Sequence, residues 1–284
     1  AVGRSLVTRL MVMAHLLTYR LDVPQEGRAT VNLNFRNLKS ENLRSSAAPI
    51  ELRLSIMPTV HGLRAAVRMP GELLQPRTLE ELRLPSAVME GLARFAQAEA
   101  GMLLLIGPAG SGKTTTIYSL LQFILRQSPG LSIVTLEDPV ERRFEGITQI
   151  EVTPFGQLTY ERTLRSMLRQ DPQVLMLGEI RDASTATLAV QAALSGHRLV
   201  STLHAPSPAG AIARLMEMGI EPYQITSSLF GIVAQRLLRL RNPGGEYAGR
   251  APAAEFVTID EPLRRGILSH ADAGDLAKIY AAQK

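Results

Sequence analysis

The clearest chemical signature in the chain is a glycine-rich loop that ends in lysine and threonine. With Thr115 it forms the predicted nucleotide-binding set: Gly107, Pro108, Ala109, Gly110, Ser111, Gly112, Lys113, Thr114. The run matches the pattern GxxxxGK[ST], stands after an apolar run and precedes a helical one. Glycines let backbone N–H groups surround phosphates, and the N-terminus of the helix adds positive potential. We expect Lys113 to reach the β and γ oxygens and the Thr114 hydroxyl to bind Mg²⁺.

The nucleotide is predicted to be ATP. Guanine-specific enzymes usually carry an Asn-Lys-x-Asp segment, and none of the four lysines follows an asparagine: Lys39, Lys113, Lys278, Lys284.

Acidic residues follow two apolar runs and compete for the magnesium and water-activating roles. Glu137 and Asp138 come after Ile133–Leu136, and Glu179 comes after Val174–Leu177. Ligand sites of parallel sheets gather at the carboxyl ends of the strands, so both positions are expected near the loop. By pattern alone, Glu137 and Asp138 look more like the acidic site of an ordinary phosphate-binding-loop enzyme. In such enzymes the aspartate on the magnesium side would stand one residue before Glu179.

Two histidines flank the run Leu199–Leu203. Their separation of seven residues on an extended segment points His197 and His204 to opposite faces, which argues against a shared metal. His204 is expected on the edge of the phosphate-binding loop, as a γ-phosphate sensor. His197 alone reads as a structural histidine.

The elements that must position these residues read as an α/β domain. Apolar runs alternate with helical spacing after Ser86, which predicts a parallel sheet covered by helices on both faces; the runs are Met102–Ile106, Leu131–Leu136, Val174–Leu177 and Leu199–Leu203.

The first seventy residues read as a smaller sheet lobe. Three runs alternate apolar and polar residues, around Val31–Phe35, Ile50–Ile56 and Leu63–Met69, and the segment Leu6–Leu17 is expected to cover them as an amphipathic helix. Arginines mark the polar side. Prolines and a glycine then cluster, so we predict an N-terminal lobe over residues 1–72, a flexible linker over 73–85 and the ATPase domain over 86–284.

Composition excludes several classes of protein. The sequence contains no cysteine, which removes disulfides and cysteine-ligated zinc. No apolar stretch approaches the roughly 18 residues that span a bilayer, and no signal peptide is expected. The net charge of +5 lies mostly in the first hundred residues, where it could face phosphates or be ordinary solvated surface.

Several motifs in order resemble the secretion ATPases of type II secretion and type IV pilus assembly. These are the loop, Glu137–Glu141, Leu168–Pro172 leading to Gly178–Asp182, and Ser201–His204; the N-terminal segments Leu21–Arg28 and Arg53–Thr59 are similar as well. The resemblance covers nearly the whole chain. It implies a RecA-like ATPase core behind a smaller, PAS-like α/β lobe, assembled into a cytoplasmic hexameric ring that docks through a polytopic platform protein at the inner membrane.

The same resemblance implies residue roles. Glu137 would orient the attacking water, Glu179 would act on Mg²⁺ partly through water, and His204 would form a histidine box with His197. Arg28 and Arg53 would reach the γ-phosphate from the N-terminal lobe. Asp138 and Arg181 belong to the matched boxes as additional candidates.

The sequence departs from the family pattern at one point, and two alternative functions remain open. Assembly and secretion members commonly carry a four-cysteine zinc module after Ala234–Leu237, whereas a short cysteine-free loop is expected here over Arg241–Pro252, so no zinc is predicted. Retraction ATPases also lack that module, although the boxes look more like the assembly or secretion branch. A RecA-like DNA motor would suit a pI near 9.8, but 5% aromatic residues and no tryptophan leave little for base stacking, and no nucleic acid is expected.

Overall fold

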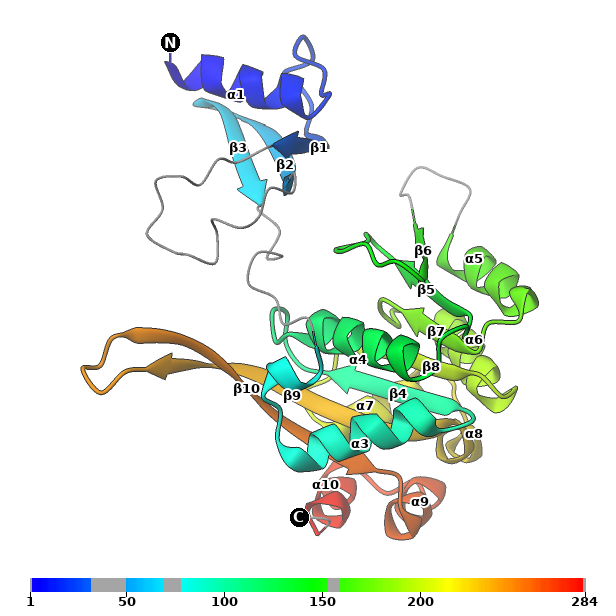
Figure 1. The fold of residues 1–284 in the computed structure, drawn as a ribbon. Helices are drawn as coiled ribbons and strands as arrows, with labels where there is room; N and C mark the ends of the chain where they lie inside the picture. The colour runs from blue at the N-terminus through cyan, green and yellow to red at the C-terminus, as the bar shows by residue number, and fades with distance from the viewer. Residues whose placement is uncertain (1, 32–49, 69–77, 153–158, 283–284) are drawn as a thin grey trace. The chain divides into compact units, whose positions relative to one another are not determined.

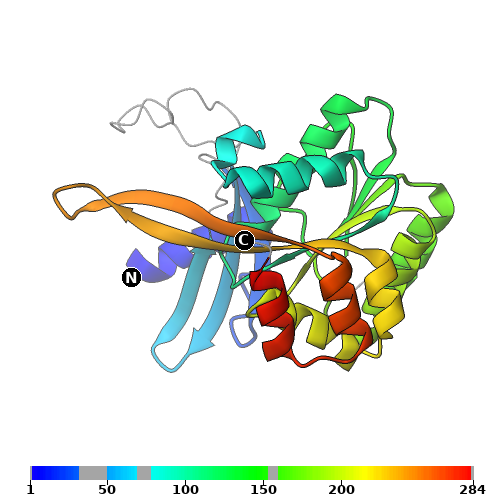
Figure 2. The same cartoon turned by 90° about the horizontal axis from the view of Figure 1, so that it is seen from below.

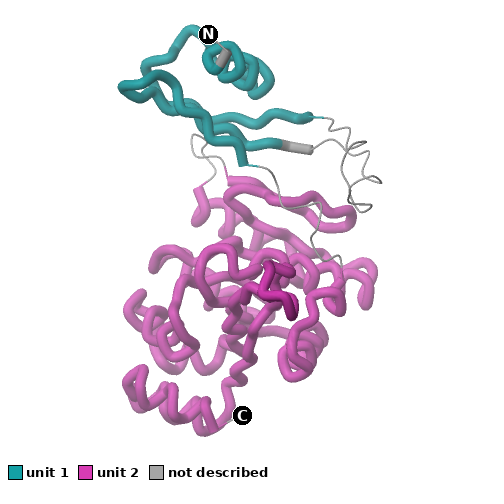
Figure 3. Tube along the Cα trace, turned by 90° about the vertical axis from the view of Figure 1, so that its left-hand side faces the viewer, with its two compact units in different colours: residues 1–75 teal, residues 76–284 magenta. Residues whose placement is uncertain are grey.

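The computed structural model describes residues 2–31, 50–68, 78–152 and 159–282. The chain divides into two compact units, residues 1–75 and 76–284, shown in different colours in Figure 3. Residues 73–77 of the predicted linker lie outside the described part. Leu79, Leu82 and Leu84, from the remainder of that linker, are buried in the core of the second unit.

The first unit is a three-stranded antiparallel sheet with one helix on its apolar face. Its elements are α1 (Val2–Met13), β1 (Gln25–Val31), β2 (Ile50–Thr59) and β3 (Gly62–Arg68), in the sheet order β1-β2-β3. Ala14, Ala29, Leu52 and Leu54 form its small core.

The predicted strand Val31–Phe35 lies outside the described part except for Val31, and the strand that is described was not predicted. The apolar alternation starting at Val31 predicted a strand over Val31–Phe35, but the strand described is β1, which ends at Val31; residues 32–36 lie outside the described part. The inner face of β1 carries small residues, which give no hydrophobic signal. Gly27 is one of them: a Cβ there would lie 2.7 Å from the carbonyl oxygen of Ala14 and from Cδ2 of Leu16. The packing therefore requires a glycine.

The second unit is a seven-stranded sheet in the order β10-β9-β4-β8-β7-β5-β6 (Figure 1). All neighbouring strands are parallel except β9 and β10. The strands are β4 (Gly101–Ile106), β5 (Ile133–Glu137), β6 (Thr148–Glu151), β7 (Val174–Leu177), β8 (Arg198–Leu203), β9 (Leu229–Arg241) and β10 (Tyr247–Thr258). The predicted α/β fold with a large parallel sheet is confirmed.

Helices cover both faces of this sheet (Figure 2). On one face lie α3 (Ser86–Gln97) and α4 (Lys113–Gln127), preceded by a 3₁₀ turn (Glu80–Leu82). On the other lie α5 (Tyr160–Met167), followed by a 3₁₀ turn (Leu168–Gln170), α6 (Ala183–Leu194), α7 (Pro208–Glu217), α8 (Pro222–Ser228), α9 (Glu261–Leu268) and α10 (Ala273–Ala281).

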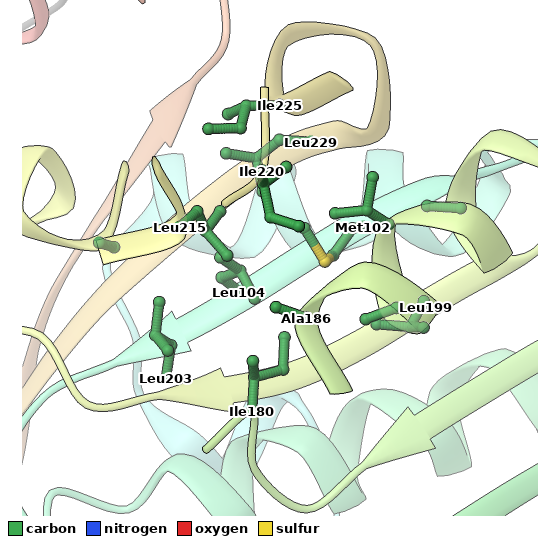
Figure 4. Packing of buried hydrophobic residues seen from close by; sticks show 14 of the residues in the cluster. Met102, Leu104, Ile180, Ala186, Leu199, Leu203, Leu215, Ile220, Ile225 and Leu229 are labelled. Atoms are coloured by element: carbon green, nitrogen blue, oxygen red, sulfur yellow. The ribbon is translucent and has the colours of Figure 1, made fainter. Parts of the chain in front are cut away.

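The central strand β4 contributes apolar side chains to the cores on both faces of the sheet. Met102, Leu104 and Ile106 enter the core under α6 to α10, part of which Figure 4 shows, while Leu103 and Leu105 enter the core under α3 and α4. Successive side chains of a strand point to opposite faces, so a strand buried on both sides must be apolar throughout. The strand is consequently a rigid base for the loop that follows it.

The expected loop over Arg241–Pro252 is wrong. Most of it is strand: β9 runs to Arg241 and β10 begins at Tyr247, so only Asn242–Glu246 turns. Pro252 sits in β10, opposite Leu237. A proline lacks the N–H that a central strand needs, but β10 is an edge strand and tolerates it. No helix in the described part of the chain is long and apolar enough to cross a membrane.

Candidate active site

The glycine-rich loop joins the end of β4 to the start of α4, as its sequence predicted. Gly107, Gly110 and Gly112 have φ of 140°, 73° and 90°, values that other residues rarely adopt. Gly112 is the N-cap of α4 and provides no side-chain cap. The first N–H groups of a helix have no partner within it, and together with the helix dipole they favour a bound anion.

Lys113 points back over this loop. Its Nζ donates hydrogen bonds to the carbonyl oxygens of Gly107, at 2.8 Å, and Pro108, at 2.9 Å. Burial lowers the pKa of Lys113, and the negative charge of Glu179 partly opposes that shift. The lysine and this carboxylate are therefore close enough to interact electrostatically, although they are far apart in the sequence.

A cluster of acidic and basic side chains and one histidine stands at the ends of β5, β7 and β8. Glu179 Oε2 accepts a hydrogen bond of 2.8 Å from Arg181 Nε, and its Oε1 lies 3.4 Å from His204 Nε2. Arg181 Nη1 also donates to Asp138 Oδ2, at 3.0 Å. The Glu179 hydrogen bond is the main cause of the raised Arg181 pKa. The structure thus brings four predicted residues together at the carboxyl edge of the sheet.

Glu137 has a different environment. It ends β5 with 2% of its surface exposed, and both carboxylate oxygens accept hydrogen bonds. Tyr118 of α4 donates to Oε2, while Thr135 Oγ1 and Gln149 Nε2 donate to Oε1 at 2.6 and 3.1 Å. Burial is the main cause of the raised Tyr118 pKa, and the neighbouring carboxylate adds to it. Glu137 therefore ties the helix of the phosphate-binding loop to β5 and β6.

His197 lies at the opposite end of the sheet from His204. It precedes β8, and its Nδ1 lies 3.0 Å from the Ala192 carbonyl oxygen, as the Nδ1–H tautomer requires. There it lines a polar hollow with Asp171, Gln173 and Arg198. Within one chain the two histidines do not meet, because the whole of β8 separates them.

The two predicted arginines of the first unit are neighbours. Arg28 of β1 lies directly opposite Arg53 of β2, and Arg68 of β3 lies opposite Arg53 on its other side. Directly opposed residues share a face of the sheet, and like charges in such pairs are unfavourable. This row, which we call the arginine row, places three positively charged side chains on one face of the sheet.

Sequence reasoning missed four residues that support the site, namely Tyr118, Gln149, Tyr160 and Gln235. Tyr160 donates to the Leu136 carbonyl oxygen at 3.1 Å, and its hydroxyl lies 2.8 Å from where Gly178 would carry a Cβ. Burial raises the Tyr160 pKa to about 12. A polar residue inside an apolar strand run, such as Gln235, is the signal that could have identified one of them.

The fit of Mg²⁺ to the site rests on the donor set. In the described part of the chain, no group of three or more His, Cys, Asp or Glu side chains could hold a metal ion. A magnesium ion, however, needs few protein ligands and takes the rest from substrate phosphates and water. The half-buried Thr114 hydroxyl and the Glu179 carboxylate, whose side chain is 22% exposed, match that requirement.

The chain is similar to known proteins over nearly all of its length. Residues 1–283 match the family model described as "Type II/IV secretion system protein". The chain is 42% identical to the type II secretion system ATPase E of Vibrio cholerae over 95% of its length, and 38% identical to the type IV pilus assembly ATPase PilB of Thermus thermophilus over 97%. It spans 51% and 34% of those two proteins.

Among solved structures, the pilus retraction motor PilT with bound ADP is similar. The TM-score is 0.70 at 27% identity, and the match covers 92% of this chain and 69% of PilT.

Proposed function

This chain belongs to the type II/IV secretion system protein family, and on that premise we propose that it is an ATPase whose hydrolysis of ATP drives type II secretion or type IV pilus assembly. One observation carries the proposal: the phosphate-binding loop, with Lys113, and the cluster around Glu179 meet at the carboxyl edge of one parallel sheet. The relatives are about twice as long as this chain or longer, so the proposal concerns the module described above.

Binding of ATP is assigned to the phosphate-binding loop. A Cβ on Gly110 would meet nothing within 4 Å, so the backbone there is open to a ligand. The N-terminus of α4 attracts the phosphates. Lys113, which now bonds two carbonyl oxygens of its own loop, can exchange those bonds for phosphate oxygens. These features favour a triphosphate over a neutral ligand.

Catalysis is assigned to the acidic strand ends. A bound Mg²⁺ would neutralise charge on the transferred phosphoryl group, and Thr114 and Glu179 are the residues proposed to hold it, Glu179 partly through water. Arg181 and His204 hold the Glu179 carboxylate in place. Glu137 is proposed to orient the attacking water, which requires one of its present donors, Tyr118 or Gln149, to release it.

The arginine row is proposed to supply positive charge to the γ-phosphate, from the same or a neighbouring protomer. Such charge stabilises the transferred phosphoryl group. The register that sets Arg28 opposite Arg53 places both guanidinium groups on one face of the sheet, as this use requires. It also fits a homo-hexameric ring, peripheral to the inner membrane through a polytopic platform protein. His197, at the other edge of the sheet, would join the histidine box only across protomers.

The direction of the motor is proposed to be assembly or secretion. The chain is 42% identical to the secretion ATPase and 38% identical to the pilus assembly ATPase, and the matched boxes are more similar to that branch. Retraction remains the second candidate, because the cysteine-free hairpin of β9 and β10 offers no zinc module.

Replacing the loop lysine tests the proposal. Lys113→Ala should abolish ATP turnover and leave the fold intact, because the hydrogen bonds of the side chain to described residues are made to the carbonyl oxygens of its own loop. Lys278→Ala is the matched control, since Lys278 is an exposed lysine paired with Asp275. Normal hydrolysis by Lys113→Ala, measured by phosphate release, would remove the site assignment.

A further inference from the structure

Gln235 occupies an unusual place on β9. The strand is parallel to β4 as far as the pair Ile106 and Ala234, so Gln235 is the first residue beyond that ladder. Its side chain is 4% exposed, in a strand whose earlier part is apolar. Beyond it, β9 continues to pair with β10 alone, and the far end of this hairpin extends away from the helices (Figures 1 and 2).

The side-chain amide of Gln235 holds the phosphate-binding loop and its helix at once. Nε2 donates a 2.9 Å hydrogen bond to the Ser111 carbonyl oxygen, and Oε1 accepts a 2.8 Å bond from Thr116 Oγ1. Reversing the amide would set its oxygen against the Ser111 carbonyl oxygen, so these partners determine its orientation. Thr116 is fully buried, which keeps both bonds away from solvent.

Two glycines of the loop make room for this residue. A Cβ on Gly107 would lie 2.2 Å from the Gln235 carbonyl oxygen, and one on Gly112 would lie 2.9 Å from its Nε2. Both glycines also have positive φ. The glycines are therefore required by the close approach of β9, in addition to the approach of phosphate that their pattern predicts.

The hydrogen bond to the Ser111 carbonyl oxygen also sets the direction of the Gly112 N–H, which belongs to the same peptide group. A trans peptide is planar, so its C=O and the following N–H point in opposite directions. Because Gln235 holds the Ser111 carbonyl toward β9, the N–H of Gly112 points away from β9. An amide whose direction is set before the ligand arrives costs less to order on binding.

We propose that Gln235 is a positioning residue for nucleotide binding, which orients the Ser111–Gly112 peptide so that its N–H is ready for phosphate. The inference rests on the proposed role of the loop as the ATP site. Gln235 acts through the loop and is not itself assigned a contact with substrate.

The alternative is that Gln235 only stabilises the fold. Removing it would take away the hydrogen-bond acceptor of the buried Thr116 hydroxyl, and an unsatisfied buried donor destabilises the folded state. A single substitution would then lower affinity merely by loosening the domain. The two roles separate in a double variant, Gln235→Met with Thr116→Val, which removes both members of the buried pair and still leaves Ser111 without its donor.

The experiment measures the dissociation constant of a fluorescent ADP analogue and the melting temperature for each variant of the full chain. Gln235→Met should weaken binding about tenfold or more, while Thr116→Val should change it less than threefold. In the double variant the melting temperature should recover toward that of Thr116→Val, and the affinity should stay low. Gln191→Met, on the exposed side of α6, is the matched control and should leave both values unchanged.

Several results would overturn the inference. Binding by Gln235→Met within twofold of the unsubstituted protein would do so, as would recovery of affinity together with melting temperature in the double variant. If Gln235→Met does not fold, the double variant alone decides between the two roles. If the unsubstituted protein itself binds no nucleotide, the proposed function fails instead, and Lys113→Ala provides that comparison.

Discussion

The Tyr118 hydroxyl, on the helix that follows the phosphate-binding loop, donates a hydrogen bond to the carboxylate of Glu137 at the end of the neighbouring β5. This bond makes the carboxylate sensitive to any movement of α4. It also restrains the group that we propose for water activation. Tyr118→Phe removes the donor but keeps the ring, which packs edge-on against Phe144.

We expect Tyr118→Phe to change the turnover number more than nucleotide affinity. Without this donor the carboxylate keeps Thr135 and Gln149 and becomes easier to release, but it loses part of its orientation. Steady-state ATPase measurements would show a change of several-fold in kcat with little change in KM. A variant with unchanged kcat would make the contact a matter of stability alone.

Glu137→Gln and Glu179→Gln should both reduce hydrolysis by about 10² or more, the scale of a positioned base or a metal-side carboxylate. They should differ in binding, because Glu179 is partly exposed beside Lys113 and Glu137 is buried. Glu179→Gln should weaken Mg²⁺-dependent ATP binding, whereas Glu137→Gln should bind ATP well and stall. Titrations with and without Mg²⁺ check this, and the reverse pattern would exchange the two roles.

Sequence patterns predicted the central part of the fold because its strands are buried on both faces. The runs Met102–Ile106 and Val174–Leu177 could be recognised as strands from hydrophobicity alone. The phosphate-binding loop could be located from its sequence pattern. The inner face of β1 could not be recognised, since Gly27 and Ala29 make contact by being small.

Contacts between residues far apart in the chain could not be predicted from the sequence either. The arginines of β1 and β2 were each matched to a motif, but only the register of the strands sets Arg28 opposite Arg53. In the same way, the burial of Glu137 depends on donors from α4 and β6 that no local pattern connects with it. The candidate catalytic residues could be predicted from their residue types and motifs. The neighbouring residues that hydrogen-bond to them or fix their position could not.

Tyr160 should make stability depend on pH in the alkaline range. Its pKa is raised by burial to about 12 in the folded protein, against about 10 when unfolded, so its contribution is complete below pH 10 and disappears as the pH rises toward 12. Between pH 9 and pH 11 the protein should therefore lose about 1 kcal/mol more unfolding free energy than Tyr160→Phe. Urea unfolding at both pH values measures the difference, and parallel losses would exclude this role for Tyr160.

DNA should stimulate ATP hydrolysis little or not at all at physiological salt. The chain has 5% aromatic residues and no tryptophan for base stacking, and its concentrated positive charge is assigned to the arginine row. Phosphate release with single- and double-stranded DNA, each at several salt concentrations, tests this. Strong stimulation that falls steeply with salt would instead favour a DNA motor.

The arginine row supplies the last prediction. Arg28→Ala or Arg53→Ala should bind nucleotide almost normally and hydrolyse it poorly, because charge that acts only in the transition state raises the catalytic rate more than the affinity. An arginine that contacts the transferred group can be worth about 10³ in rate. Arg9→Ala, an exposed arginine on α1, is the matched control and should turn over normally.

Mixing variants then tests whether the arginines act between protomers. Arg28→Ala retains an intact loop, and Lys113→Ala retains an intact arginine row, so a mixed ring contains sites with both parts only if the row serves a neighbour. Partial recovery of activity on mixing two inactive proteins is the expected result. Absence of recovery in rings shown to be mixed would confine the arginines to their own protomer, and unchanged turnover by both single variants would make the row ordinary surface charge.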